Sequence, residues 1–144
     1  MIENTGEGLD TLSFATRTTA VTVYLNLTTV QAVHSNRTLQ LNSHSTIENL
    51  VGSPYNDTLY GNSANNLIEG GSGDDAIDGS DGMDTAAYNV TYAQARVVKT
   101  ASGFSVQSVS DGHDTLQSIE YLRFSDQTID LQVWRESSGT PQST

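Results

Sequence analysis

Apolar residues in the middle of the chain recur at intervals of nine, at Leu59, Ile68, Ile77 and Ala86. Each lies at the centre of a three-residue run that fits a short strand. The residues between these runs are rich in Gly, Asn, Asp and Ser, which favour tight turns because their backbone or side chains tolerate positive φ. The pattern predicts short strands joined by tight turns.

The same spacing divides residues 52–87 into four consecutive nonamers, GSPYNDTLY, GNSANNLIE, GGSGDDAID and GSDGMDTAA. Position one is always glycine. Position six reads Asp57, Asn66, Asp75 and Asp84. Ordinary turns do not recur at a fixed spacing with a fixed apolar position, so the pattern indicates a repeat architecture.

The period also predicts how the nonamers are arranged in space. If each nonamer forms half a coil, two nonamers close one coil of a flattened solenoid, and the apolar eighth position points inward from both sheets. Turns that are two nonamers apart then stack on the same edge, with parallel strands about 4.8 Å apart. The acidic side chain of one turn and the carbonyl groups of the next would therefore surround a shared space.

The charge distribution indicates which kind of ligand would bind between the stacked turns. The net charge is −11, and no Lys or Arg lies between Arg37 and Arg96, whereas eight carboxylates do. Such a segment would stay loose unless cations neutralise it. Calcium accepts six to eight oxygens in loose geometry, magnesium demands a stricter octahedron, and zinc prefers the nitrogen or sulfur ligands that this stretch lacks. The sequence therefore predicts calcium.

Other classes of function are disfavoured. The acidic balance argues against nucleic acid or an anionic membrane surface as a partner, and no apolar run is long enough to span a membrane. The chain has no cysteine, and its three histidines show no paired spacing. No nucleophile with a base is apparent, so we expect no enzymatic activity.

The nonamers resemble the GGxGxDxUx repeats of RTX (hemolysin-type) calcium-binding modules of type I secreted bacterial proteins. The resemblance implies an all-β fold, a short parallel β-roll flanked by β-rich capping segments. It also implies about two calcium ions, each between two turns of one edge, and a third ion if Asp10 or Asp114 completes an edge site. The first edge pairs 52–57 with 70–75, and the second pairs 61–66 with 79–84. Asn66 departs from the family's carboxylate, so the second site should be weaker.

In that family, position-six side chains and carbonyl groups of positions one to four hold the ion. Carried over to this chain, the metal residues are Asp57, Asp75, Asn66, Asp84, Gly52, Pro54, Gly71, Gly73, Gly61, Ser63, Ser80 and Gly82. Pro54 is a further departure, because small residues are commoner there. Asp74, Asp78 and Asp81 lie off position six and are interpreted as solvated turn residues.

The flanks repeat two motifs of their own. GxDT-like elements begin at Gly8, Gly82 and Gly112, and IExL elements begin at Ile47 and Ile119. Between them we expect strands at 21–27, 38–42, 96–100 and 104–107. The chain is therefore divided into an N-terminal β-rich cap (1–51), the roll (52–87), a C-terminal β-hairpin cap (88–131) and a flexible tail (132–144). A solenoid needs such caps because its ends expose strand edges.

The leading hypothesis is a non-enzymatic calcium module of a larger protein, exported by type I secretion from a Gram-negative bacterium and folding on extracellular calcium. The chain is interpreted as a fragment of that protein. The alternative is a calcium-dependent carbohydrate-binding or adhesion module. In it, Arg17 and Arg37 would contact an acidic polysaccharide, although cap salt bridges are the simpler explanation for these residues. The sequence leaves the oligomeric state open.

Overall fold

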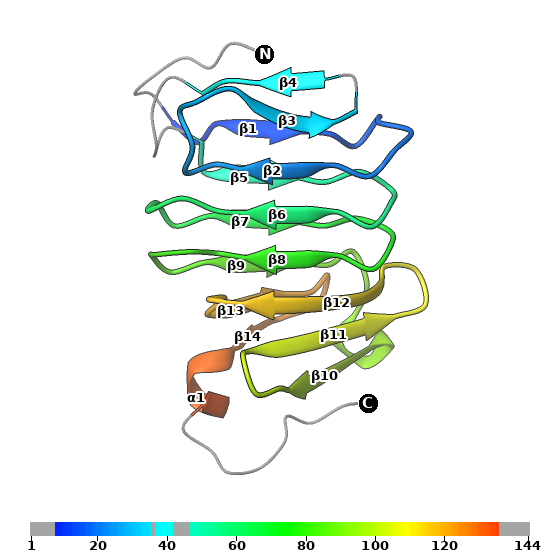
Figure 1. Cartoon of the computed structure of the whole chain (residues 1–144). Helices are drawn as coiled ribbons and strands as arrows, with labels where there is room; N and C mark the ends of the chain where they lie inside the picture. The colour runs from blue at the N-terminus through cyan, green and yellow to red at the C-terminus, as the bar shows by residue number, and fades with distance from the viewer. Residues whose placement is uncertain (1–7, 36, 42–46, 136–144) are drawn as a thin grey trace.

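Two facing sheets form a flattened roll in the computed structural model, which describes residues 8–35, 37–41 and 47–135 (Figure 1). The first sheet has the strand order β1-β5-β7-β9-β13-β14, and the second has the order β10-β11-β12-β8-β6-β2. Successive strands of the roll alternate between the two sheets, so the chain winds as coils. The predicted all-β fold with a parallel β-roll is confirmed.

The strands of the first sheet are β1 (Thr11–Ser13), β5 (Asn49–Val51), β7 (Leu67–Glu69), β9 (Thr85–Ala87), β13 (Tyr121–Arg123) and β14 (Thr128–Asp130). Those of the second sheet are β2 (Thr22–Tyr24), β6 (Thr58–Tyr60), β8 (Ala76–Asp78), β12 (Gly112–Gln117), β11 (Phe104–Ser108) and β10 (Ala95–Lys99). The pairs from β1 to β13 and from β2 to β12 are parallel, whereas β14, β11 and β10 run antiparallel to their neighbours.

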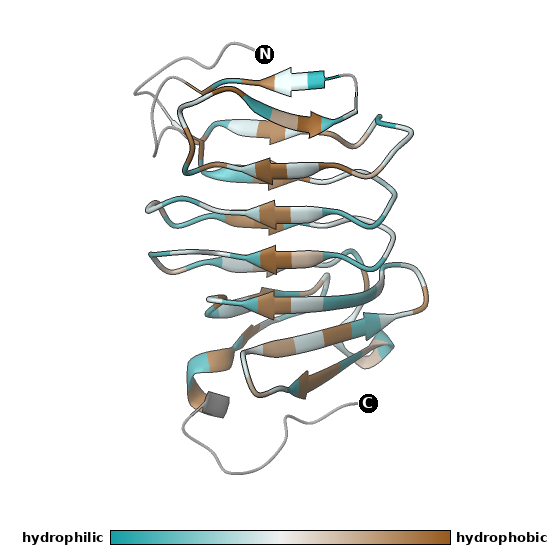
Figure 2. Ribbon diagram, in the orientation of Figure 1, coloured by the Kyte–Doolittle hydropathy of each residue, from teal (hydrophilic) through white to brown (hydrophobic). Residues whose placement is uncertain are grey.

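The core is a stack of inward-pointing residues from the centres of the strands. In the first sheet Leu50 pairs with Ile68, and Ile68 pairs with Ala86. In the second sheet Leu59 pairs with Ile77. All five are at most 3% exposed, as expected when alternate residues of a strand face the interior. Figure 2 shows hydrophobic segments stacked from strand to strand along the roll. Burying each of the larger side chains contributes about 1.5–3 kcal/mol.

The roll extends beyond the nonamers on both sides. On the N-terminal side, β1 pairs with β5 and β2 pairs with β6. On the C-terminal side, β12 pairs with β8 and β13 pairs with β9. The GxDT and IExL motifs therefore begin strands of additional coils. The division into two caps, a roll and a tail stays a prediction, and residues 1–7 and 136–144 lie outside the described part.

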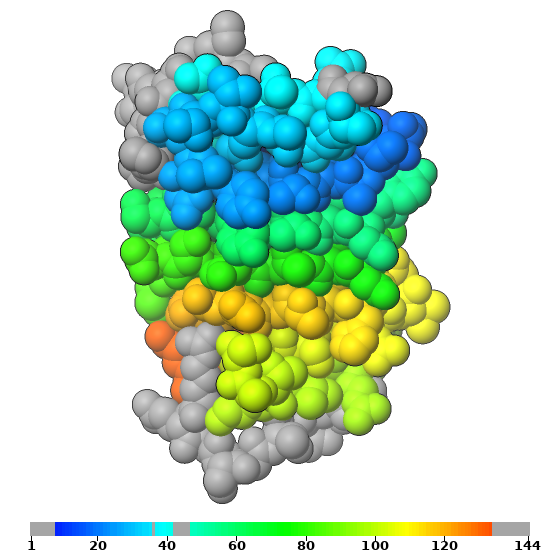
Figure 3. Space-filling view, in the orientation of Figure 1, coloured from blue at the N-terminus to red at the C-terminus, as the bar shows by residue number. Residues whose placement is uncertain are grey.

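Two insertions interrupt the winding and lie at its ends. One carries the antiparallel pair β3 (Gln31–His34) and β4 (Arg37–Leu39). The other carries the 3₁₀ turn η1 (Tyr92–Gln94) and the hairpin of β10 and β11. The second insertion lies beyond the last coil, although it precedes that coil in sequence (Figure 3). A short helix, α1 (Leu131–Arg135), follows β14.

The predicted strands are found with shifted ends. The expected strand at 21–27 is β2, the expected pair at 96–100 and 104–107 is β10 with β11, and the strand at 38–42 begins at Arg37 as β4. The ranges predicted for the flanks did not include β1, β3, β5, β12, β13 or β14, and the helix α1 occupies residues 132–135, which were assigned to a flexible tail. Within the described residues, no helix is long and apolar enough to cross a membrane.

Candidate metal centre

The turns of the roll stack along two edges, and their position-six residues form a hydrogen-bonded ladder on each. In every step, the backbone N–H of position six donates to the position-six side chain one coil later. On the first edge Asp57 N donates to Asp75 Oδ1 over 2.8 Å. On the second edge Asn66 N donates to Asp84 Oδ1 over 2.7 Å. The predicted pairing of turns on each edge is therefore present in the backbone.

Residues of the flanks complete both ladders. On the first edge Asp75 N donates to Asp114 Oδ1 over 2.9 Å, which places the GxDT acid in the next coil. On the second edge Asp84 N donates to Glu120 Oε2 over 2.8 Å. The glutamate of the other IExL motif, Glu48, accepts from Asp10 N over 2.9 Å. The repeated motifs were the signal for these positions. The sequence places Asp10 at position six of the nonamer-like segment 5–13 and aligns Asp114 with Asp84, but it did not place Glu48 and Glu120 in the ladders.

Position five forms a second ladder that runs in the opposite direction. Asp74 N donates to Asn56 Oδ1 over 2.8 Å, and His113 N donates to Asp74 Oδ1 over 2.9 Å. On the other edge Met83 N donates to Asn65 Oδ1 over 3.0 Å. Asp74 is exposed, as expected for a turn residue, and in addition it joins two coils.

The first turn of each edge is closed by its own hydrogen bonds. Ser53 donates to Asp57 twice, from its N–H over 2.5 Å and from its hydroxyl over 2.6 Å. In the turn 61–66, Asn62 N donates to Asn66 Oδ1 over 2.9 Å. Ser53 and Asn62 are both buried at position two. Sequence reasoning missed this role, because the family has glycine there.

The amide of Asn66 places donors where a carboxylate would place acceptors. Its Nδ2 donates to the carbonyl of Glu48 over 3.2 Å and to that of Ile47 over 3.3 Å. Asn62 Nδ2 also donates to the Ile47 carbonyl, over 2.8 Å. These two carbonyl groups thus have hydrogen-bond partners without any ion.

The second turn of each edge lacks such closure. Asp75 and Asp84 are 2% and 0% exposed, and the Oδ2 of each is buried without a hydrogen-bond partner. Position two of these turns has positive φ, 93° at Gly71 and 66° at Ser80. Ser80 N donates to Asp78 Oδ1 instead of to position six. A buried oxygen acceptor without a donor is costly, so these two atoms indicate a missing positive partner.

The electrostatics of the ladders agree with that interpretation. Burial raises the pKa of Asp75 to about 8, with further contributions from the Asp114, Asp57 and Asp74 carboxylates. Burial likewise raises the pKa of Asp84 to about 7, and Glu120 adds to this shift. Burial also raises the pKa of Asp114 to about 7. Burial therefore favours the protonated or cation-bound form of these acids over the free carboxylate.

Oxygen atoms also surround the position-one glycines. A Cβ on Gly52 would lie 2.5 Å from both Asp57 Oδ2 and the Gly70 carbonyl oxygen. A Cβ on Gly61 would contact Asn66 Oδ1 and the Gly79 carbonyl oxygen even more closely. Only glycine fits at such a point. Side-chain and carbonyl oxygens of two coils meet there, which is the donor set that calcium prefers.

The predicted metal residues lie where their spacing places them. Asp57, Asn66, Asp75 and Asp84 are buried in the ladders, and Gly52 and Gly61 are buried beside them. The remaining members lie at the half-buried or exposed surface of the turns, and they are Pro54, Ser63, Gly71, Gly73, Ser80 and Gly82. Among the described residues, no three His, Cys, Asp or Glu side chains converge as a metal site. A cation would therefore rely on backbone carbonyl oxygens, and the ligand roles stay a prediction.

Comparison with known families agrees with this geometry. Residues 51–86 match the model of the RTX calcium-binding nonapeptide repeat in four copies, and no curated protein matches the chain. The matched segment contains both orphaned carboxylate oxygens. Residues 51–86 are therefore an array of four RTX calcium-binding nonapeptide repeats wound as a β-roll, and calcium is the ion that such repeats bind.

Proposed function

We propose that this chain is a non-catalytic calcium-binding module of a larger secreted or cell-surface bacterial protein, and that extracellular calcium folds it. The observation that carries the proposal is the pair of buried, unpartnered oxygens on Asp75 and Asp84. Export by type I secretion is the route that the repeat type suggests. In this view the ion is part of the folded structure, not a cofactor of a reaction.

The proposed switch works through charge. Without a cation, the buried acids of the two edges repel one another and resist leaving water. Where calcium is scarce, the segment between Arg37 and Arg96 then stays loose, because it contains no Lys or Arg. Extracellular modules bind calcium with dissociation constants of about 10⁻⁴ to 10⁻³ M. An ion at about 100 times its dissociation constant contributes roughly 2.7 kcal/mol per site.

The deciding experiment is thermal unfolding followed by circular dichroism, with the protein in EGTA, in calcium and in magnesium at equal ionic strength. Two sites would raise Tm by on the order of 15 °C in calcium. Magnesium should raise it much less, because its octahedral geometry suits these turns poorly. Equal transitions in EGTA and in calcium would contradict the proposal.

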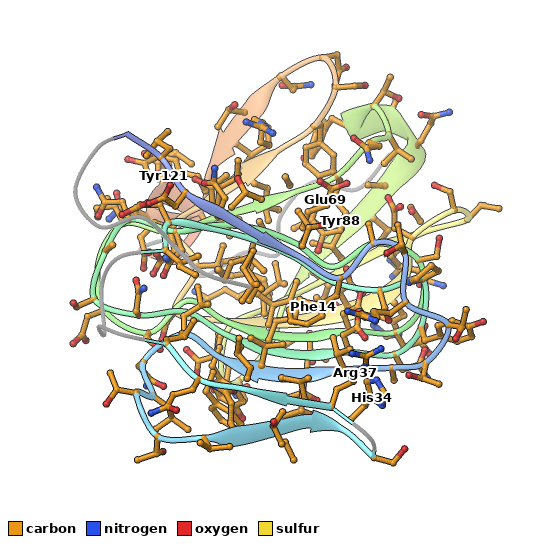
Figure 4. All side chains as sticks on the ribbon, turned by 90° about the horizontal axis from the view of Figure 1, so that it is seen from above. Phe14, His34, Arg37, Glu69, Tyr88 and Tyr121 are labelled. Atoms are coloured by element: carbon orange, nitrogen blue, oxygen red, sulfur yellow. The ribbon has the colours of Figure 1, made fainter. Side chains whose placement is uncertain are left out.

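A second candidate function rests on a different surface. Arg17, His34 and Arg37 line one cavity of about 410 Å³ beside β3 and β4, and Figure 4 shows His34 and Arg37 close together at the rim of the roll. In a chain of net charge −11, this grouping favours an acidic ligand such as a uronate polysaccharide. Titration with alginate should give binding that Arg17→Gln weakens, whereas Arg96→Gln leaves it unchanged.

A further inference from the structure

The same pair of oxygens recurs beside three of the position-one glycines. At Gly52 and Gly61, the pair is the position-six oxygen of the same turn and the position-one carbonyl of the next coil. At Gly79, the pair is Asp84 Oδ2 and the carbonyl oxygen of Ser118. Ser118 lies outside every nonamer and outside the matched residues 51–86. The C-terminal coil therefore supplies a carbonyl where a further repeat would have supplied one.

Hydrogen bonding distinguishes the third pair from the other two. Asp57 Oδ2 accepts from Ser53 N, and Asn66 Oδ1 accepts from Asn62 N. Asp84 Oδ2 has no hydrogen-bond partner, and the side chain is fully buried. On the second edge, the buried oxygen without a hydrogen-bond partner is therefore Asp84 Oδ2, and it lies beside Gly79, as does the Ser118 carbonyl oxygen.

Glu120 also makes the contact that position six of a nonamer makes, because its side chain accepts from the position-six N–H of the preceding coil. Its Oε2 accepts from Asp84 N over 2.8 Å, just as Asp84 Oδ1 accepts from Asn66 N one coil earlier. Only Ile119 separates Glu120 from Ser118, whereas four residues separate positions one and six of a repeat. The longer glutamate side chain compensates for this shorter turn. The coil 118–120 therefore reproduces the position-one and position-six contacts without the nonapeptide sequence.

The space beside this coil is large and polar. A cavity of about 580 Å³ lies between the turn 79–84 and the hairpin of β10 and β11, and Asp81, Ser118 and Glu120 line it together with Lys99. Asp84 is buried beneath this cavity and does not line it, so the cavity would hold the water ligands of an ion whose inner contact is the Asp84 carboxylate. Lys99 is an alternative counter-charge, so a test must separate the ammonium group from a bound cation.

We propose that Asp84, the Ser118 carbonyl and Glu120 form a divalent-cation site at the junction of the last repeat and the C-terminal coil. The site rests on the proposed calcium function and extends it by an ion that the nonapeptides alone do not account for. It joins the insertion-bearing end of the chain to the repeat array.

Equilibrium dialysis with radioactive calcium counts the ions in the full chain, in Glu120→Gln and in Glu48→Gln. Glutamine at 120 still accepts from Asp84 N but lacks the charge, so this variant should bind one ion fewer. Glu48 is the matched control, because its Oε2 likewise accepts from a backbone N–H, that of Asp10 over 2.9 Å, while its backbone carbonyl is already occupied by the Asn66 amide. Its variant should bind as many ions as the original chain. Equal counts for all three proteins, or equal losses in both variants, would overturn the site.

Lys99→Gln addresses the alternative counter-charge. If a cation occupies the site, removal of the ammonium group tightens calcium binding and leaves the count unchanged. If Lys99 itself neutralises Asp84, the variant loses stability in EGTA and gains nothing in calcium, and the site is refuted.

Amide resonances of the unmodified chain provide a readout that does not depend on how a variant folds. Those of Ser118, Glu120 and Tyr121 should shift during a calcium titration. Shifts confined to the turns 52–57 and 70–75 would refute this site while leaving the proposed function intact. A chain that binds no calcium at all would refute both.

Discussion

Removal of calcium should invert the way in which stability depends on pH. Asp75 has a pKa of about 8 in the folded, metal-free chain, against an ordinary value of 3.8, because it is buried. The folded state therefore holds this proton more tightly than the unfolded state does. The resulting stabilisation is complete below pH 4 and is lost as pH rises toward 8. Asp84 behaves alike, with a pKa of about 7.

The loss of stability with rising pH can be estimated from the raised pKa of Asp75. Each pKa unit corresponds to about 1.4 kcal/mol, so full ionisation of Asp75 costs on the order of 5 kcal/mol. Small domains have a total stability of only about 5–15 kcal/mol. Through Asp75 alone the metal-free chain should therefore lose on the order of 4 kcal/mol between pH 5 and pH 8, a large part of such a total. Saturating calcium reverses the sign, because it binds the ionised acids and competes with protons.

The assay is urea unfolding at pH 5, 6, 7 and 8, with protein that has been dialysed free of divalent ions and again in calcium. Without the ion the free energy of unfolding should fall with pH, and with the ion it should rise or stay level. Asp75→Asn should flatten the metal-free slope and reduce the gain from calcium, since Asn66 shows that this position accommodates an amide. The exposed acid Asp126 is the control, and Asp126→Asn should keep both slopes. A metal-free stability that is flat or rising from pH 5 to pH 8 would refute the reasoning.

Two further substitutions test individual contacts. Asn66→Asp removes the amide donors from the Ile47 and Glu48 carbonyls and adds a buried charge, so it should cost on the order of 2 kcal/mol in EGTA. It should also enlarge the Tm gain in calcium, and an unchanged gain would show that the amide does not replace an ion. Tyr88→Phe removes the buried bond of 3.0 Å from the hydroxyl group to Asp114 Oδ2. Urea unfolding should show a loss of about 1–3 kcal/mol, whereas no loss would mean that this bond contributes nothing.

The nine-residue period was sufficient to predict the central architecture. A fixed apolar residue every nine positions has one simple explanation in a packed chain, namely a ladder of inward side chains such as Leu59 above Ile77. The same period placed Asp57 and Asp75 on one edge. These features are local and repeat, so a single sequence contains enough information to predict them.

The outer coils were harder to predict because insertions break the period. Leu12 pairs with Leu50 and Ile77 pairs with Leu116, although their positions differ by 38 and 39 in the sequence. In each case an antiparallel pair of strands is inserted in the intervening sequence, and it lies at an end of the roll. The GxDT and IExL motifs signalled the recurrence but not the register. Register is set by the hydrophobic pattern together with the geometry of the connecting turn, and at these coils the insertions replace the short turns that fix the register inside the repeats.

The roles of position two also depend on the folded backbone. Ser53 and Asn62 stand at position two, where the repeat GGxGxDxUx has glycine. Both side chains are buried in their turns and make hydrogen bonds there. A serine at position two does not always make these bonds. Ser80 has a positive φ, and its N–H donates to Asp78 Oδ1 and not to the position-six side chain. The direction of one N–H group therefore separates turns that satisfy the position-six side chain from turns that leave one of its oxygens unpartnered.

The side chain at position six of the nonamers is thus accommodated in two different ways. Where the residue is Asn66, its own amide group donates to the preceding coil, and the contact is independent of calcium and of pH over the usual range. Where it is Asp75 or Asp84, the second oxygen remains unpartnered, and in the proposed switch a proton or a cation would neutralise it. Because the two kinds of turn share one continuous core, the self-satisfied coils can hold the others in register before an ion arrives. A module built only of the second kind would lack that template.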